Sequence, residues 1–301
     1  MKIPSQRIRP KSRDEWLALR KEVVTSTEMA GLFGVSRWTS AFQLWHEKRD
    51  LVESSFVETE RTKWGLRLEK VVAEAVAEKL GIQVWEEDEF RMSRSHGIGA
   101  SYDFKAEYEL EMTPLEVKTV DPMQFREHFV AEGDELIELP LEYELQLQTQ
   151  LALYDSEKII FGVLVGGNKL YTIIREEDPK VLDAILKKAK EFQEMTEPPK
   201  PSYEQDFDAI NKIYSHAEAG EEIGAGEELD RLMGTYAHLH EIESGAAKGK
   251  SAVKAQIQEQ IGTASKVFGS EYKITRSKVE PTDISYTRAG YLTFKMTKVK
   301  R

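Results

Sequence analysis

The chain has 301 residues, of which 40% are hydrophobic and 32% charged, enough for one large domain or for a domain with an appendage. It contains no cysteine, which excludes disulfides, thiolate zinc sites and Cys-ligated iron–sulfur clusters. The first residues, Met1 to Gln6, lack the apolar core of a signal peptide, and no apolar run approaches the ~20 residues of a membrane span. We therefore expect a cytoplasmic protein without membrane contact.

The charge is distributed unevenly along the chain. The net charge is −11, yet residues 202–247 hold 11 acids and 2 bases, whereas residues 248–301 hold 12 bases and 4 acids. Net charge argues only weakly against a nucleic-acid partner, because DNA contacts a local patch of the surface.

The first 80 residues have the pattern of four helices. Ser12 can cap a helix over residues 12–21, with Glu15 three positions later as in a capping box. The hydroxyls of residues 25–27 precede a short helix over residues 28–33, and such a start suits either a phosphate site or ordinary capping. Further helices are expected over residues 40–50 and 59–80, the last with an apolar stripe.

The middle of the chain alternates between strands and helices. We predict an edge strand over residues 82–92, a hairpin containing 99–103 and 115–118, a helix with a loop over 124–138, a helix over 142–154, a hairpin over 159–175 and a helix over 179–195. The leucines of 142–154 alternate, but most of its residues are good helix formers. The expected fold class is therefore α/β (α+β), a central mixed β-sheet flanked by helices.

The stretch Pro198-Pro199-Lys200-Pro201 predicts a domain boundary. We expect a core over residues 1–200 and an appendage over residues 201–301. In the appendage the pattern predicts helices over 203–219, 226–245 and 250–268, and short strands over 271–298.

Three polar residues of the central hairpin form a candidate catalytic site. Side chains alternate along a strand, so Glu116 and Lys118 share one face, and Asp103 on the other arm can lie beside them. Carboxylates are the ligands that Mg²⁺ prefers, and a lysine can hold the attacking water of a phosphodiester hydrolysis. Glu69, four residues after Gly65 on the long helix, is a candidate outer ligand. Either motif taken alone is also typical of a solvated surface.

Taken together, the motifs resemble the lambda-exonuclease or YqaJ-type viral recombinase family of the PD-(D/E)xK nuclease superfamily. The matching pieces are Trp16-x-x-x-Arg20, Thr27-Glu28 with Leu32-x-Gly34, Leu44-Trp45-x-x-Lys48, Trp64-Gly65-x-x-x-Glu69, Ser101-x-Asp103, Glu116-x-Lys118 and Tyr143-x-x-Gln146-x-Gln148. Their order covers residues 12–175 and implies a restriction-endonuclease-like core.

The resemblance implies a role for each matching residue. Asp103, Glu116 and the carbonyl of Val117 would bind Mg²⁺, for which Mn²⁺ could substitute, and Glu69 would act on the metal partly through water. Lys118 would position the hydrolytic water, and Gln146 would bind near the scissile phosphate. The pocket for a 5′-terminal phosphate would contain Arg20, Thr27 and Ser101, with Tyr143 supporting its wall. One departure is Tyr102, which stands where the family usually has a proline.

The resemblance implies a Mg²⁺-dependent 5′→3′ exonuclease that resects double-stranded DNA ends to 3′ overhangs for phage-type recombination. It would act with a single-strand-annealing protein, in the host cytoplasm if phage or prophage encoded, and the family often forms a ring-shaped homotrimer. Two alternatives stay open, a structure- or sequence-specific endonuclease on the same fold and a non-catalytic DNA-end-binding or recombinase-loading module. Efficient nicking of closed circles would favour the first, and inactivity with divalent metal the second.

Overall fold

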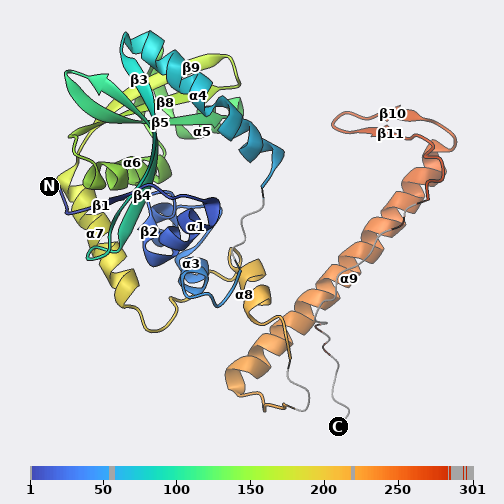
Figure 1. The fold of residues 1–301 in the computed structure, drawn as a ribbon. Coiled ribbons are helices and arrows are strands. Elements are labelled where there is room, and N and C mark those ends of the chain that lie inside the picture. Colours follow the sequence, from blue (N-terminus) through green and yellow to red (C-terminus); the bar gives the residue numbers. More distant parts are fainter. Residues whose placement is uncertain are drawn as a thin grey trace. The chain divides into compact units, whose positions relative to one another are not determined.

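The computed structural model of the chain describes residues 2–53, 58–217, 221–283, 285, 294 and 296. They divide into two compact units, residues 1–214 and residues 215–301, and Figure 1 labels their elements. In chain order the first unit contains β1 (Gln6–Ile8), α1 (Arg13–Glu22), β2 (Val24–Thr25), α2 (Met29–Leu32), α3 (Ala41–Lys48), α4 (Glu60–Leu80), β3 (Gln83–Ser93), β4 (Ile98–Tyr108), β5 (Glu111–Val120), α5 (Pro122–His128), β6 (Val130–Glu132), β7 (Glu135–Glu138), α6 (Leu141–Leu153), β8 (Lys158–Val165), β9 (Lys169–Glu176), α7 (Pro179–Glu194) and α8 (Phe207–Ile213).

Within the described residues, nine strands of the first unit form one mixed sheet, in the order β1-β3-β4-β5-β8-β9-β7-β6 with β2 beside β4. Neighbouring pairs are antiparallel except for three parallel pairs, β5 with β8, β7 with β9 and β2 with β4. The expected central mixed sheet flanked by helices is therefore confirmed.

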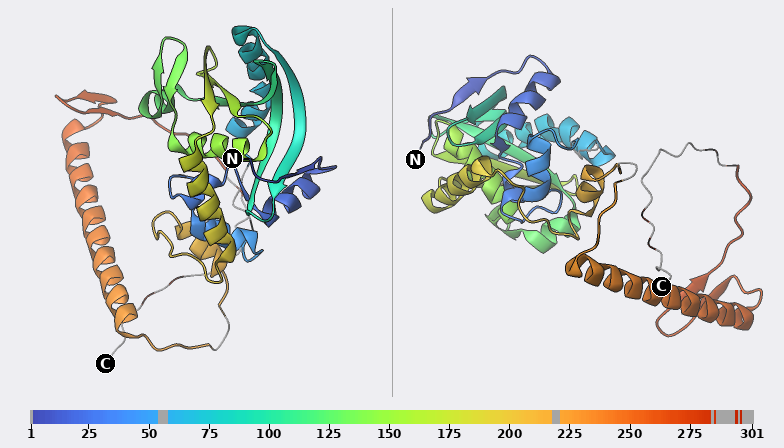
Figure 2. Two further views of the ribbon diagram at one scale, coloured as in Figure 1. Left: turned by 90° about the vertical axis from the view of Figure 1, so that its left-hand side faces the viewer. Right: turned by 90° about the horizontal axis from the view of Figure 1, so that it is seen from below.

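Two helices cover the middle of the sheet from opposite faces (Figures 1 and 2). Ile160 of β8 packs with Val72 and Val76 of α4, while the alternate residue Phe161 packs with Leu147 of α6. Thr59 caps α4 by accepting from the N–H of Thr62, and the left-handed Gly81 (φ +68°) ends it. Helix α6 is buried on all sides from Leu145 to Leu153, so its glutamines lie inside the protein together with its leucines.

Several sequence-based expectations differ from the structure of the first unit. Residues 124–138 were expected to be a helix with a loop, but α5 ends at His128 and an antiparallel hairpin, β6–β7, follows around Gly133 (φ +61°). Strand β3 is not at the edge, because β1 pairs with it through Gln6↔Met92.

The first unit also extends beyond the expected boundary at residue 200. Asp206, only 1% exposed, accepts from the backbone N–H of Ser202 at 2.8 Å and also contacts the Ser40 hydroxyl, which caps α3. The side chain of Gln205 donates to the Ser36 carbonyl at 2.8 Å. These contacts fasten the segment that leads into α8 to the first unit, and the division between the units follows Tyr214.

The second unit contains α9 (Glu227–Ile261) and a short hairpin, β10 (Lys266–Phe268) and β11 (Lys273–Thr275). One continuous helix of 35 residues thus replaces the two expected over 226–245 and 250–268. Of the strands expected over 271–298, β11 is present, while residues 284, 286–293, 295 and 297–298 lie outside the described residues. Among the helices that the structure describes, none is both long and apolar enough to cross a membrane.

Candidate active site

The site lies where two paired strands separate. Strands β4 and β5 pair from Tyr108↔Glu111 to Phe104↔Leu115 and then separate, with β4 continuing beside β3 and gaining β2, and β5 continuing beside β8. Asp103 and Glu116 are the next residues on the two strands, so they stand at the opening of this fork. The central pair of carboxylates predicted from the sequence is therefore brought together by the end of the β4–β5 ladder.

Glu116 is held by donors on both oxygens. The ammonium of Lys118 donates to its Oε1, as expected for two residues on one face of a strand, and the side-chain amide of Gln150 donates to its Oε2 at 2.7 Å. The residue is 5% exposed. Burying a carboxylate is costly unless it is paired and hydrogen-bonded, and Glu116 meets both conditions.

The neighbouring carboxyl groups disfavour one another's ionisation. Desolvation, followed by the charge of Glu116, raises the pKa of Asp103 to about 6, although solvent still reaches this side chain. Desolvation, followed by the charge of Asp103, raises the pKa of Glu69 on α4 to about 7. A cation bound among these groups would relieve both shifts, because opposite charge favours the ionised form.

Lys118 remains a cation in this site. Desolvation alone would lower the pKa of Lys118, but the charge of Glu116 and the hydrogen bond to it outweigh that effect and raise the pKa. The side chain is therefore suited to hold an anion or a water molecule, and is poorly suited to accept a proton.

The glutamines of α6 have different surroundings. Gln146 is 6% exposed and lies one turn before Gln150. Gln148 has a structural role, since it donates to Glu144 at 3.0 Å and to the Glu176 carbonyl at 2.9 Å, and accepts from the N–H of Asp178 at 2.9 Å.

Gln150 also belongs to the site, although no sequence motif indicated it. Its position four residues after Gln146 placed it on the same helix face, but only the tertiary structure shows that this face meets Glu116 and the Ser101 carbonyl.

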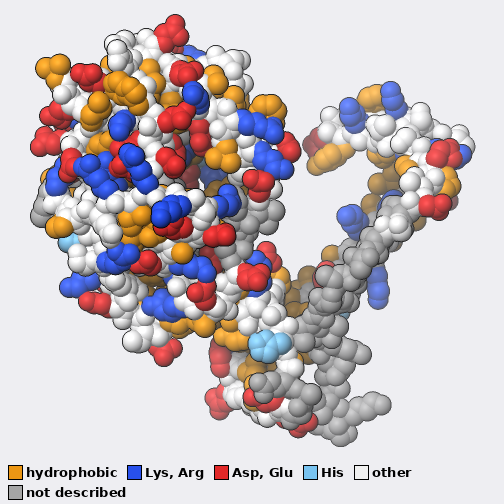
Figure 3. Space-filling model, viewed as in Figure 1, with side chains coloured by type: hydrophobic (Ala, Val, Ile, Leu, Met, Phe, Trp, Pro, Cys, Tyr) orange, Lys and Arg blue, Asp and Glu red, His pale blue; other side chains and the backbone are white. Residues whose placement is uncertain are grey.

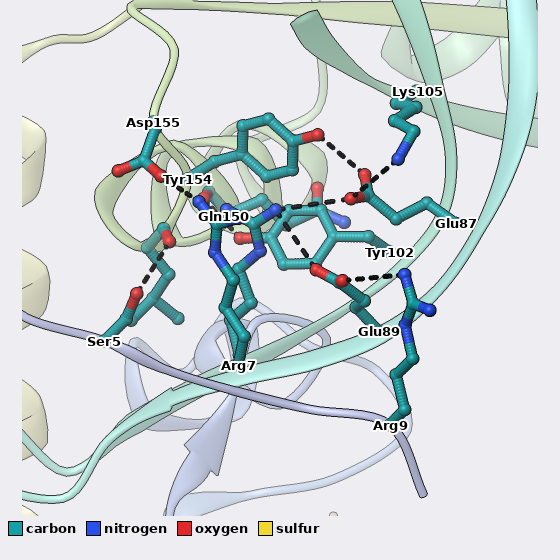
Figure 4. A network of polar contacts seen from close by, with 12 residues as sticks. Ser5, Arg7, Arg9, Glu87, Glu89, Tyr102, Lys105, Gln150, Tyr154 and Asp155 are labelled. Atoms are coloured by element: carbon teal, nitrogen blue, oxygen red, sulfur yellow. Dashed lines mark hydrogen bonds and ion pairs between the residues drawn. The ribbon is translucent and has the colours of Figure 1, made fainter.

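Behind the fork, a polar network anchors α6 to β3 and β4, and Figure 4 shows part of it. The hydroxyl of Tyr102 donates to the backbone carbonyl of Gln150 at 2.6 Å, and the hydroxyl of Tyr154 donates to Glu87 at 2.7 Å. The buried guanidinium of Arg91 lies 3.7 Å from the ring centre of Tyr154 and pairs with Glu87 at 3.3 Å. Tyr102, the departure from the family pattern, therefore helps to fix the helix that carries Gln150.

Three residues predicted to bind a terminal phosphate form a second cluster. The guanidinium of Arg20 donates to the Thr27 hydroxyl at 3.3 Å and lies 4.7 Å from the ring centre of Trp16. The indole N–H of Trp16 donates to the Ser101 hydroxyl at 2.9 Å. Ser101 precedes Asp103 by two residues on β4, a separation of about 7 Å along a strand. The two clusters are therefore adjacent.

Glu28 and Lys48 support the Arg20 cluster. Glu28 accepts from Lys48 at 2.7 Å and from Arg20 at 3.4 Å. Although desolvation acts in the opposite direction, the charges of Lys48 and Arg20 lower the pKa of Glu28. The cluster therefore holds Arg20 between an aromatic ring and a carboxylate.

Tyr143 belongs to the carboxylate side of the site. Its ring packs 5.7 Å from that of Phe129 and 5.6 Å from that of Phe161. Burial raises the pKa of Tyr143, and the nearby charge of Lys118 opposes this shift. Within the described residues, no hydrogen bond or ring contact joins Tyr143 to Arg20, Thr27 or Ser101, so its support of the pocket wall stays a prediction.

The donor set fits a hard divalent cation. Asp103, Glu116 and Glu69 provide carboxylate oxygens, and the carbonyl of Val117 follows Glu116 directly in β5. Among the described residues, no three His, Cys, Asp or Glu side chains already surround a point where a metal could sit. The two oxygens of Glu116 are turned toward Lys118 and Gln150.

Comparison with known proteins finds a family model and several proteins to which parts of this chain are similar. Residues 15–157 match the family model described as the YqaJ-like viral recombinase domain. The uncharacterized protein YqaJ of Bacillus subtilis (strain 168) is 31% identical over 184 residues, 60% of this chain and 55% of that protein. The chain thus spans about half the length of this curated relative.

Two solved structures show a weaker likeness. The alkaline exonuclease LHK-Exo from Laribacter hongkongensis aligns with a TM-score of 0.46 and 18% identity, over 60% of this chain and 90% of that one. A phage related exonuclease from Haemophilus somnus 129PT aligns with a TM-score of 0.39 and 14% identity, over 67% and 91%.

Proposed function

Because residues 15–157 match the family model of the YqaJ-like viral recombinase domain, we propose that this chain is a nuclease that hydrolyses DNA phosphodiester bonds with a divalent metal ion. One observation above all supports the proposal, the meeting of Glu69, Asp103, Glu116 and Lys118 at the β4–β5 fork. Three carboxyl groups beside a charged lysine would be suited to hold a cation and a phosphate together.

The residues of the fork have separate parts in the proposed reaction. Asp103, Glu116, Glu69 and the carbonyl of Val117 would hold the ion, with Mg²⁺ as the expected species and Mn²⁺ as a substitute. The ion would lower the pKa of the attacking water and offset charge on the scissile phosphate.

The remaining side chains would act on the water and on the phosphate. Lys118 would position the attacking water through its N–H groups, since it keeps its proton. Gln146, nearly buried on α6, would hydrogen-bond to the scissile phosphate.

The Arg20 cluster supports a 5′→3′ exonuclease in particular. Arg20, Thr27 and Ser101 would bind a 5′-terminal phosphate through charge-assisted and neutral hydrogen bonds. Ser101 lies two residues from Asp103 on β4, so the cluster would set the terminal phosphate at a fixed distance from the bond to be cleaved. Digestion of one strand from a duplex end would leave a 3′ overhang, the substrate of a single-strand-annealing partner.

The surface of the first unit is compatible with a DNA substrate despite the net charge of −11. On the face shown in Figure 3, acidic and basic side chains are interspersed over this unit. Binding would therefore depend on local groups such as Arg20 and Lys118, and each phosphate contact would make the affinity sensitive to salt.

The experiment compares linear duplexes that carry a 5′-phosphate or a 5′-hydroxyl with closed circles, in Mg²⁺ and in EDTA. We expect Mg²⁺-dependent release of nucleotides from linear duplexes, fastest from 5′-phosphate ends. Glu116→Ala should lower the rate by several orders of magnitude while DNA binding persists, because a member of a coupled catalytic unit is removed. Rapid nicking of closed circles would support an endonuclease instead, and a Glu116→Ala protein of near wild-type rate would refute the assignment.

A further inference from the structure

Helix α9 exposes an apolar stripe along its whole length. No residue of this helix is buried. Five large apolar residues are spaced to lie on one face of the helix, and each is between 39% and 57% exposed. They are Leu232, Tyr236, Leu239, Val253 and Ile257. Tyr236 also meets the ring of Phe294 edge-on, with 5.5 Å between centroids, and this contact leaves half of it exposed. A stripe of this kind is typical of a helix that packs against another helix.

The helix also needs support from outside its own sequence. Gly234, Gly245 and Gly249 lie in its interior, and glycine is among the poorest helix formers. A side chain at any of the three would meet nothing within 4 Å. Since isolated helices in water are marginal and most helical stability in proteins comes from packing, the exposed stripe is the surface that would provide it.

Two charged residues interrupt the stripe, and their signs and positions are complementary. Glu243 and Lys250 both lie on the stripe face, and they are equally distant from the midpoint between Ala246 and Ala247. If two copies of α9 lie antiparallel across this midpoint, Glu243 of each copy faces Lys250 of the other. In a parallel pair, each of these residues would instead face its own kind.

The same arrangement matches the apolar residues by size. It places Leu232 opposite Ile261, Tyr236 opposite Ile257 and Leu239 beside Val253, with the small Ala246 at the axis. Each match occurs twice, as a self-complementary two-fold interface requires.

The distribution of charge along the helix also favours an antiparallel pair. Residues 227–243 contain five acids and one base, whereas residues 248–261 contain three bases and one acid. We propose that α9 forms an antiparallel two-helix interface with α9 of a second copy of this chain.

The test measures the self-association of the full-length protein by sedimentation equilibrium. We expect the natural chain to pair through α9, as a dimer or, if it also forms the ring-shaped homotrimer that the resemblance implies, as a pair of trimers. Glu243→Lys alone and Lys250→Glu alone each place like charges opposite one another twice, and should weaken the dimer by about tenfold or more. The double variant Glu243→Lys/Lys250→Glu restores opposite charges and should return to within about threefold of the natural dissociation constant. Circular dichroism of each variant checks that the helix still forms.

A monomeric natural chain, or single variants that associate as well as the natural chain, would overturn the proposal. Such results would leave the stripe to a different protein or to another part of the same chain. Failure of DNA cleavage would not bear on this test, which uses no substrate.

The absence of cysteine permits a direct test of orientation. Ala246→Cys lies beside the two-fold axis and should form a disulfide-linked dimer under mild oxidation. Leu229→Cys lies near the helix start, so the two copies would be at opposite ends of the interface and should not cross-link. Efficient cross-linking through Leu229→Cys would indicate a parallel pair and overturn the antiparallel arrangement.

Discussion

The side-chain amide of Gln150 donates to Oε2 of Glu116 at 2.7 Å and so connects the buried helix α6 to strand β5. The same nitrogen donates to the Ser101 carbonyl at 3.3 Å. Because the amide nitrogen faces two acceptors, its orientation is fixed, and the opposite oxygen, Oε1, has no partner within the described residues. Together with Lys118 on the other oxygen, Gln150 fixes the orientation of the Glu116 carboxylate.

Replacing Gln150 should weaken metal use without unfolding the protein. Gln150→Leu keeps the apolar bulk but leaves Oε2 of a buried carboxylate without its donor. A hydrogen bond to a charged group contributes ~1.5–3 kcal/mol, so cleavage should fall roughly 10- to 150-fold and need more Mg²⁺ for half-maximal rate. The measurement is initial rate against Mg²⁺ concentration.

Gln148→Leu is the matched control, two residues away on the same helix. It removes the contacts to Glu144 and Glu176, so it should lower the melting temperature and leave the Mg²⁺ concentration for half-maximal rate unchanged. If both variants shifted only the melting temperature, Gln150 would be a structural residue.

Protons and the metal ion should compete for the carboxyl groups of Asp103 and Glu69. With the pKa of Asp103 at about 6 and that of Glu69 at about 7, both carboxyls take up protons as the pH falls from 8 to 5. Cleavage at limiting Mg²⁺ should therefore fall on the acid side, and higher Mg²⁺ should move this limb of the profile to lower pH. If the acid limb of the pH–rate profile stays at the same pH over a wide range of Mg²⁺ concentrations, neither carboxyl group binds the metal.

The raised pKa of Glu69 also predicts a pH-dependent stability in the absence of metal. The folded protein binds the proton more tightly than the unfolded chain, because the pKa rises from 4.5 to about 7. The stability contributed by this group is present below about pH 4.5 and is lost as the pH rises through 7. Glu69→Gln should therefore increase the free energy of unfolding at pH 8 and change it little at pH 4.

Denaturant titrations at the two pH values, in EDTA, test this expectation. Adding Mg²⁺ at pH 8 should stabilise the natural chain more than Glu69→Gln, since a ligand stabilises the state that binds it. A Glu69→Gln protein that is less stable than the natural chain at pH 8 would contradict the assignment.

Arg20 should determine the preference for phosphorylated ends. Arg20→Ala removes a charged donor, worth ~1.5–3 kcal/mol, and should reduce the advantage of 5′-phosphate over 5′-hydroxyl ends by roughly 10- to 150-fold. The measurement is the ratio of the two rates on otherwise identical duplexes. Arg94→Ala, which breaks an exposed pair with Glu22 and a hydrogen bond to the Gln6 side chain, is the control and should leave the ratio unchanged. An equal loss of cleavage rate on 5′-phosphate and 5′-hydroxyl ends would mean that Arg20 has only a structural role.

The end of the first unit can be tested by truncation. A chain that stops after Tyr214 retains Asp206 and Ala209, which is 6% exposed, and should stay folded and cleave short duplexes. A chain that stops after Lys200 loses the contacts of Asp206 with Ser202 and Ser40 and should be less stable. Melting temperatures of the two proteins decide between the boundaries, and equal values would support the earlier one.

Local patterns predicted most elements of the first unit, because the signals for them lie within a few residues. The stripe and caps of α4 and the hairpin β8–β9 are examples. Residues 124–138 were predicted wrongly because Leu136 is buried by a long-range contact, and the turn at Gly133 was too weak a signal against helix-forming neighbours. The pairing of β1 with β3 joins segments about 80 residues apart, which no local pattern records.

The candidate site was predictable to the extent that it depends on strand alternation and order along the chain. Asp103, Glu116 and Lys118 could be placed together on those grounds. The link from Gln150 to Glu116, and the bridge of Trp16 between Arg20 and Ser101, depend on how α6 and α1 pack, so the sequence alone could not give them. The roles of all these residues in cleavage remain predictions.

Where the β4–β5 ladder stops, two apolar side chains form the last rung. Phe104 and Leu115 are buried against α4, and the gap between Asp103 and Glu116 opens directly beyond them. A change in side-chain volume at either residue would widen or narrow the gap between Asp103 and Glu116. Since cavity size distinguishes cations of different radius, metal preference could drift in evolution through these two hydrophobic residues while every ligand stays the same.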